Sequence, residues 1–274
     1  MKPIRGLAMG TAAAWHFRGA LAAFAAAVGV ELASQALRGP QGAGPAGWLA
    51  LLAAASWVMG LVWRERVGVA RAWLCLVWLL LASLTAMLLA TRRGFLFGRL
   101  EFPDGEIPLL GGVPASVPLL WWLVVGGGFL VVEGFWGDLR AGVSGYTALV
   151  AVLMAAMILP VVGSLRGYWR WQERPAPGGP LFFGMPWVAL AAWFTVALGL
   201  ALGLVMLGDN RSSAEERAGR QAWAPAAVLL ALTAVCLGAN LAAGLWLAVA
   251  FSAANAALFG VVVVGYLRTR AGKR

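Results

Sequence analysis

The stretch AWLCLVWLLLASLTAMLLA, residues 72–90, decides the fold class of this chain. It contains no charged residue, and an α-helix of about 20 apolar residues is long enough to cross the hydrocarbon core of a bilayer. The rest of the chain has the same character, since 62% of its residues are hydrophobic and 12% are charged. A water-soluble domain could not bury so much apolar surface, so the sequence predicts an integral membrane protein.

Eight apolar runs of sufficient length occur along the chain. They fall near 19–37, 46–63, 72–90, 114–135, 142–163, 181–207, 223–242 and 244–267. The last two are almost continuous, which predicts a tight helical hairpin. Trp15, His16 and Arg18 interrupt the apolar core that a signal peptide would need, so the first run is expected to be a retained helix. We therefore expect an all-α polytopic membrane protein without β-sheet, a single transmembrane domain over residues 1–274.

Basic residues indicate how this bundle is oriented. With eight spans, both termini and three of the loops lie on one side, and that side carries 14 of the 21 basic residues. These are Lys2, Arg5, Arg18, Arg64, Arg66, Arg71, Arg140, Arg211, Arg217, Arg220, Arg268, Arg270, Lys273 and Arg274. The positive-inside rule then predicts a multi-pass protein of the cell (inner, cytoplasmic) membrane with both termini in the cytoplasm.

Several function classes lack the residues they need. One histidine is too few for a His-rich metal or haem site, and no phosphate-binding glycine loop follows a strand. The net charge of +10 is explained by topology and by anionic membrane lipids, so no nucleic-acid partner is expected. Cys75 and Cys236 lie within spans and are expected to pack there without forming a disulfide. Glycines such as 126–128 indicate close helix packing, or alternatively a slot for a long flat ligand.

The segment GRLEFPDGEIPLLGGVPASVPLLWW, residues 98–122, places Glu101, Asp104 and Glu106 at the mouth of a hydrophobic span. A second segment, YWRWQERPAPGGPLFFGMPWVALAAWF at 168–194, repeats its organisation. Each runs from basic and aromatic residues through a Pro/Gly-rich loop to a Gly-x-Pro. Proline is well tolerated in the first helical turn, so each Gly-x-Pro is expected to mark the start of a span.

A tryptophan follows each of these prolines by seven residues, at Trp121 and Trp193. Seven residues are nearly two helical turns, so each tryptophan lies on the same helix face as its proline. Both spans start on the non-cytoplasmic side, and we interpret the two tryptophans as walls of one cavity. The alternative is that they anchor helices at the lipid headgroups. For Trp169 and Trp171 the two interpretations are equally supported.

At these residues the chain resembles the membrane-bound carotenoid hydratases, which include bisanhydrobacterioruberin hydratase and the 1,2-hydratase of acyclic carotenoids. The family pattern is a glycine- and aromatic-rich run, then Gly-Val-Pro, Val-Pro and Trp, and a second block with Tyr-Trp-x-Trp and Gly-x-Pro-Trp. The resemblance covers roughly 72–207. The substrate-binding residues that it implies are Phe97, Phe102, Pro114, Trp121, Tyr168, Trp169, Trp171, Pro186, Trp187 and Trp193.

The chain departs from this pattern at several positions where the family usually has polar residues. Ala155 and Leu159 stand where the family has aspartates, and Ala189 stands where it has an asparagine. Met87 replaces a glutamate, and Leu100 replaces a tyrosine. These departures do not change the expected family fold, but they remove polar side chains on which the chemistry of the family could depend.

Hydration of a terminal isopropylidene group needs a carboxylic acid that stays protonated near neutral pH. Desolvation and neighbouring carboxylates both raise the pKa of a carboxyl group, and an acidic loop at a span mouth meets both conditions. Asp104 is therefore the first candidate for the acid, followed by Glu101 and by Glu133, which lies within a span. The alternative is a solvated acidic loop balanced by nearby arginines. Glu31 is also charged within a span, and Asn240 and Asn255 are expected to join helices.

Three functions remain open from the sequence. The first is a carotenoid hydratase acting on a lipophilic polyene without a cofactor. The second is a non-catalytic relative that binds carotenoid or assembles with other carotenoid biosynthesis enzymes. The third is a small-solute transporter, which inverted repeats would favour, although the repeat seen here is parallel.

Overall fold

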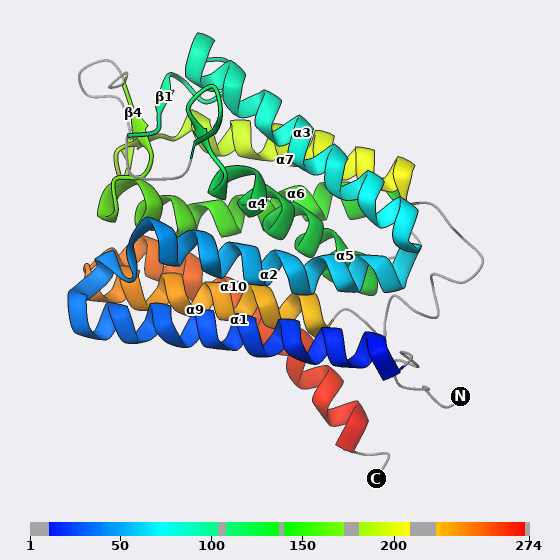
Figure 1. Cartoon of the computed structure of the whole chain (residues 1–274). Coiled ribbons are helices and arrows are strands. Elements are labelled where there is room, and N and C mark those ends of the chain that lie inside the picture. Colours follow the sequence, from blue (N-terminus) through cyan, green and yellow to red (C-terminus); the bar gives the residue numbers. More distant parts are fainter. Residues whose placement is uncertain (1–10, 104–107, 137–139, 173–180, 209–222, 272–274) are drawn as a thin grey trace.

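The computed structural model describes residues 11–103, 108–136, 140–172, 181–208 and 223–271 (Figure 1). Within these ranges eight helices are long and apolar enough to cross a membrane, which confirms the predicted all-α, multi-pass architecture. Six form single rods, namely α1 (Thr11–Arg38), α2 (Gly44–Val67), α3 (Val69–Arg93), α7 (Val188–Leu207), α9 (Trp223–Ala242) and α10 (Trp246–Ala271). A short 3₁₀ turn, η1 (Gly39–Gln41), joins α1 to α2.

The other two spans each contain a π-helical segment. The fourth span runs through α4 (Ser116–Trp121), η2 (Trp122–Gly127) and α5 (Gly128–Trp136). The fifth runs through α6 (Arg140–Leu159) and η3 (Pro160–Leu165). Such segments are rare and are often found at functional sites, because they re-aim the side chains on a helix.

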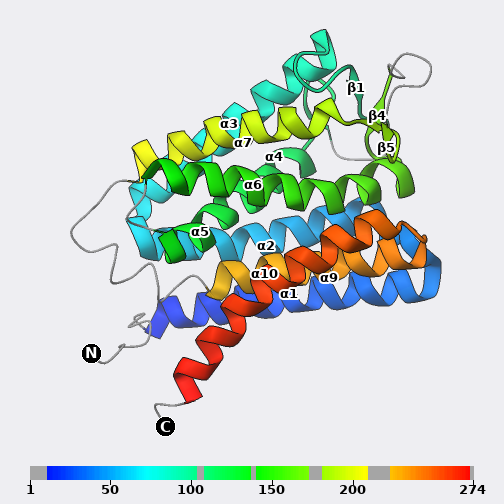
Figure 2. The same ribbon diagram turned by 180° about the vertical axis from the view of Figure 1, so that it is seen from behind.

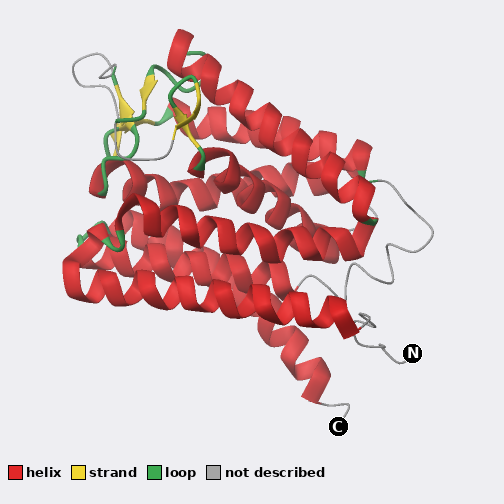
Figure 3. Ribbon diagram, viewed as in Figure 1, coloured by secondary structure: helices red, strands yellow, loops and turns green. Residues whose placement is uncertain are grey.

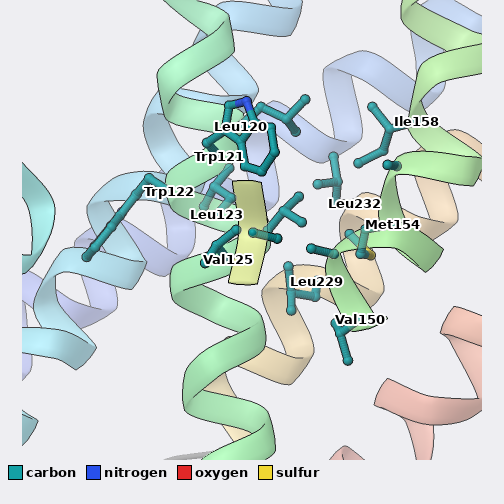
Figure 4. Close-up of a cluster of buried hydrophobic side chains, with 14 of the residues drawn as sticks. Leu120, Trp121, Trp122, Leu123, Val125, Val150, Met154, Ile158, Leu229 and Leu232 are labelled. Carbon is teal, nitrogen blue, oxygen red and sulfur yellow. The ribbon is translucent and has the colours of Figure 1, made fainter. Parts of the chain in front are cut away.

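The fourth span is the centre of the bundle. In its apolar stretch of 18 residues 83% of the residues are buried, compared with 22% in the corresponding stretch of the first span. Figures 1 and 2 show α3 and α7 on one side of this central span and α1, α9 and α10 on the other. Figure 4 shows its side chains Leu123 and Val125 in one buried cluster with Met154 of α6 and Leu229 of α9. Glycines 126–128 pack closely here, since a Cβ on Gly127 would meet side chains of α2 and α9.

Six short strands of the described residues cap one end of the bundle (Figure 3), and the expectation of no β-sheet was wrong in this respect. β1 (Leu100–Glu101) pairs with β4 (Arg170–Trp171), β2 (Pro108–Leu110) with β3 (Val113–Pro114), and β5 (Leu181–Phe182) with β6 (Met185–Pro186). All three pairs are antiparallel. The strands are too short for an alternating apolar pattern, but they satisfy backbone hydrogen bonds at the end of an apolar bundle.

The last two residues of each Gly-x-Pro motif form the second strand of a hairpin that leads directly into a helix. Gly112 and Gly184 are each the second residue of a two-residue turn, and both central residues of each turn have positive φ. This is the backbone of the hairpin turns that match strand twist. Helices α4 and α7 begin two residues after Pro114 and Pro186. The motifs therefore precede the spans, and their prolines lie before the first helical turn.

The two hairpins lie at the same end of the molecule. The pairing of β1 with β4 joins their loops, and Figure 1 shows both loops opposite the N-terminus and the α2–α3 turn. Inside the bundle, Asn240 donates a hydrogen bond to the Met157 carbonyl (3.1 Å) and Asn255 donates one to the Leu153 carbonyl (2.9 Å). Both asparagines therefore join the last two helices to α6, as expected.

Candidate substrate site

Five aromatic residues in or directly beside the two repeated segments form one contiguous group, which we call the aromatic cluster: Phe97, Phe102, Trp121, Trp169 and Trp193. Trp121 and Trp193 stack with ring centroids 4.0 Å apart and planes 13° apart. Trp169 is nearly parallel to Trp193, at 6.4 Å and 14°. Phe97 meets Trp193 edge-on at 6.5 Å, and Phe102 meets Trp169 edge-on at 5.8 Å. These are the offset-stacked and T-shaped geometries that aromatic quadrupoles favour.

The hairpin end of the bundle positions this cluster. Trp121 and Trp193 are each the sixth residue of their helices, α4 and α7, which follow directly from the two hairpins. Phe97 and Trp169 come from the loops that β1 and β4 hold together. The indole N–H of Trp171 donates to the Phe97 carbonyl (3.0 Å), and the backbone N–H of Gln172 donates to the Arg99 carbonyl (2.9 Å). Segments about 70 residues apart in sequence are thereby fixed as one platform.

The two central tryptophans are fully buried and touch each other, so they do not face one another across an open slot. Their side chains are 0% and 2% exposed for Trp121 and Trp193. The indole N–H of Trp121 has no hydrogen-bond partner among the described residues. A buried donor without a partner costs free energy, and a hydroxyl group or a water molecule at this point would satisfy it.

The remaining aromatic and proline candidates lie around the cluster. Tyr168 and Trp171 are half-buried against the core, and Pro114 is buried in β3. Trp187 is 41% exposed and contacts Phe182 with centroids 4.9 Å apart, and Pro186 is half-buried beside it in β6.

Phe182 and Phe251 were not selected from the sequence. Phe182 is buried and contacts Phe251 of α10 edge-on at 5.9 Å. Phe182 could have been found from its place two residues before Gly184 in the repeated segment. Phe251 carries no such signal, because it lies in an ordinary apolar helix.

Of the acidic candidates the structure describes Glu101 and Glu133, which belong to different groups of residues. Asp104 and Glu106 lie outside the described residues. Glu101 in β1 is exposed, and its carboxylate accepts a hydrogen bond from the Gln172 side chain. The apolar surroundings expected around a proton-donating carboxyl group are therefore not found at Glu101.

Glu133 lies near the opposite end of the central span, 12 residues after Trp121, which corresponds to roughly 18 Å along a helix. It forms an ion pair with Arg66 of α2. The Arg66 guanidinium lies 5.5 Å from the Trp63 ring and 5.8 Å from the Phe129 ring. Glu133 therefore belongs to a second polar and aromatic group, separate from the aromatic cluster.

The positions at which the chain departs from the hydratase pattern are packed into the apolar core. Met87, Ala155, Leu159 and Ala189 are all buried, as is Leu100 in β1. None of these side chains can exchange a proton. Among the described residues no group of three or more His, Cys, Asp and Glu side chains could hold a metal ion.

The fold and this site define the class of protein. The eight apolar helices among the described residues make it a multi-pass α-helical membrane protein with a buried aromatic cluster at one end.

The chain belongs to the carotenoid biosynthesis protein family, because the family model of that description matches residues 46–261. The matched region contains both repeated segments and extends from α2 into α10, while α1 lies outside it. No curated protein and no solved structure matched the chain. Family membership gives the protein a role in carotenoid biosynthesis.

Proposed function

We propose that this protein binds an acyclic carotenoid at the aromatic cluster and adds water to the terminal double bond of that polyene. The observation that carries the proposal is the contact between Trp121 of the first segment and Trp193 of the second, in a chain of the carotenoid biosynthesis family. Flat aromatic faces suit a conjugated polyene, which offers only apolar and π contacts. Tyr168, Trp171, Trp187, Pro114 and Pro186 would flank the bound chain.

The reaction would proceed through a tertiary carbocation. A carboxylic acid adds a proton to the less substituted carbon of the terminal alkene, water adds to the cation, and the resulting oxonium loses a proton. The indole faces would stabilise the cation by cation–π attraction. The free N–H of Trp121 would hold the incoming water or the product hydroxyl. Asp104 is the first candidate for the acid, followed by Glu101.

The closed stack sets a requirement on binding. Because Trp121 and Trp193 touch, a polyene would have to part the two rings or lie along their edges beside Phe97 and Phe102. A carotenoid is soluble only in the bilayer, so it would reach the cluster from the surrounding lipid.

A second candidate function is carotenoid binding, or assembly with other carotenoid biosynthesis enzymes, without catalysis. The exposure of Glu101 favours it, as do the apolar residues Met87, Ala155, Leu159 and Ala189 at positions that are polar in the hydratases. Small-solute transport is the third choice. The two hairpins enter from the same end, whereas transporter repeats are commonly inverted.

We also propose that the chain forms one transmembrane domain in the cell membrane, with the hairpin end outside and both termini in the cytoplasm. The eight described helices share a single apolar core, and 14 of the 21 basic residues belong to the termini and loops that an eight-span topology assigns to the cytoplasmic side.

Pigment composition tests the function directly in cells. A host that makes an acyclic polyene with isopropylidene ends, such as lycopene, is compared with and without this protein. The hydratase proposal predicts a more polar pigment that has gained the mass of one water molecule per reacted end. Unchanged pigment that co-purifies with the protein would favour the binding function, and unchanged pigment without co-purification would contradict both.

A further inference from the structure

The end of the fifth span is bonded to the turn between α1 and α2. Arg166, the first residue after η3, donates from Nη2 to the Glu31 carboxylate of α1. Its Nε donates to the Pro40 carbonyl at 3.3 Å, and the Gln41 side chain donates to the Leu165 carbonyl at 2.8 Å. Two hydrogen bonds with the turn and one with α1 thus hold the segment that leads into the aromatic cluster.

Glu31 is the centre of this connection. Its side chain is 1% exposed and that of Arg166 is 0% exposed. The carboxylate also accepts hydrogen bonds from the Ala43 amide and from Gln35, both at 3.2 Å. A Cβ at Gly42 would overlap the ion pair, so only glycine fits against it. A buried charge pair persists only where its geometry is good and its other polar atoms are bonded, as they are at this carboxylate.

The backbone transmits the position of Arg166 to the aromatic cluster. Gly167 donates to the Gly163 carbonyl at 3.1 Å, and Tyr168 donates to the Val162 carbonyl at 2.7 Å. Trp169 follows immediately and lies parallel to Trp193. Only two residues separate Arg166 from Trp169, so a displacement of the Arg166 backbone is expected to change the position of the indole.

We propose that Glu31 is a positioning residue for the carotenoid site, which holds Trp169 in the aromatic cluster through Arg166. The identity of the ligand, a carotenoid, rests on the proposed function, whereas the hydrogen bonds that connect Glu31 to Arg166 do not. Glu31 belongs to α1, a helix outside the family-matched region. The first span would therefore be a working part of the site rather than an added membrane anchor.

The test compares Glu31→Gln with wild type in detergent, well below the unfolding temperature. Near-ultraviolet circular dichroism reports fixed packing of aromatic side chains and should change, because Trp169 loses its fixed orientation. Hydrated product should fall on the order of 100-fold, as is typical when a reactive geometry is misplaced by about 1 Å. Asn255→Ala is the matched control, since it removes a buried polar contact of α10 with α6 and should leave the spectrum unchanged.

The double variant Glu31→Gln/Arg166→Gln separates positioning from charge burial. It leaves no unpaired buried charge, so it should insert and fold even if the single variant does not. The proposal predicts that its aromatic spectrum and product yield stay defective. A wild-type spectrum and wild-type yield in the double variant would overturn the proposal. A changed spectrum in a protein whose wild type binds no polyene would support the positioning and contradict the proposed function.

Discussion

At the scale of single residues, Trp193 is the centre of the aromatic cluster. It is stacked on Trp121, parallel to Trp169 and in edge contact with Phe97. A side chain with three aromatic neighbours fixes the relative positions of both repeated segments, so its loss should affect the stability of the fold and the binding of the polyene together.

Trp193→Ala should lower the free energy of unfolding by about 3–5 kcal/mol and abolish co-purification of polyene, because it removes the shared ring. Trp193→Phe keeps an aromatic face and should retain part of both. Trp246→Ala is the control, since Trp246 is 71% exposed on α10. Thermal unfolding in detergent and pigment absorbance measure the two effects. Equal polyene retention in Trp193→Ala and Trp246→Ala would contradict the site assignment.

The second prediction at this scale concerns the acid. Asp104→Asn keeps the shape of the side chain and removes its proton, so hydroxylated product should fall on the order of 100- to 10,000-fold while the protein still inserts. Glu106→Gln should matter less. Chromatography of extracted pigment measures the yield. Full yield from both Asp104→Asn and Glu101→Gln would turn attention to Glu133 or to a relative without hydratase chemistry.

Sequence reasoning grouped aromatic residues that lie close together in the structure, but it did not predict that Trp121 and Trp193 touch. The seven-residue spacing from Pro114 and Pro186 placed Trp121 and Trp193 on corresponding helix faces, and family resemblance added Trp169. Whether two such rings enclose a slot or stack depends on the separation of α4 and α7, which no single-sequence pattern encodes. The exposure of Glu101 depends likewise on the pairing of β1 with a strand 70 residues away.

At the scale of elements, eight spans were predictable because apolar runs of about 20 residues are typical of helices that cross a membrane. The six strands were not, because each is two or three residues long. The two hairpins repeat one geometry, with positive φ at Gly111, Gly112, Phe183 and Gly184. Their turns aim α4 and α7, so the backbone of these turns should matter more than the local side chains.

Gly184→Ala tests the hairpin turn. The new Cβ would meet no atom within 4 Å, so the expected loss of about 1–2 kcal/mol in the free energy of unfolding comes from left-handed backbone strain alone. Gly199→Ala is the matched control, since Gly199 also has open space but lies in the helix α7. It should gain about 0.5–1 kcal/mol. Thermal unfolding of the two variants should therefore shift in opposite directions, and a shared direction would contradict the role given to the turn.

At the scale of the whole molecule, both repeated loops lie at one end and the α2–α3 turn lies at the other (Figure 1). Native Cys75 and Cys236 are buried, so cysteines introduced at exposed positions can report sidedness. Phe95, at the hairpin end, is 54% exposed, and Val69, at the opposite end, is 58% exposed. In intact cells a membrane-impermeant maleimide should label Phe95→Cys and spare Val69→Cys until the membrane is permeabilised. The reverse pattern would mean that both termini face outward.

The most direct measurement of the central claim follows the oxygen atom. Purified protein is incubated without molecular oxygen, with an acyclic polyene in detergent and with water enriched in heavy oxygen. The proposed hydration predicts a tertiary alcohol whose new oxygen carries the isotope of the water. Recovery of unchanged polyene from folded protein, or a product whose oxygen does not come from water, would contradict the assignment of this protein as a carotenoid hydratase.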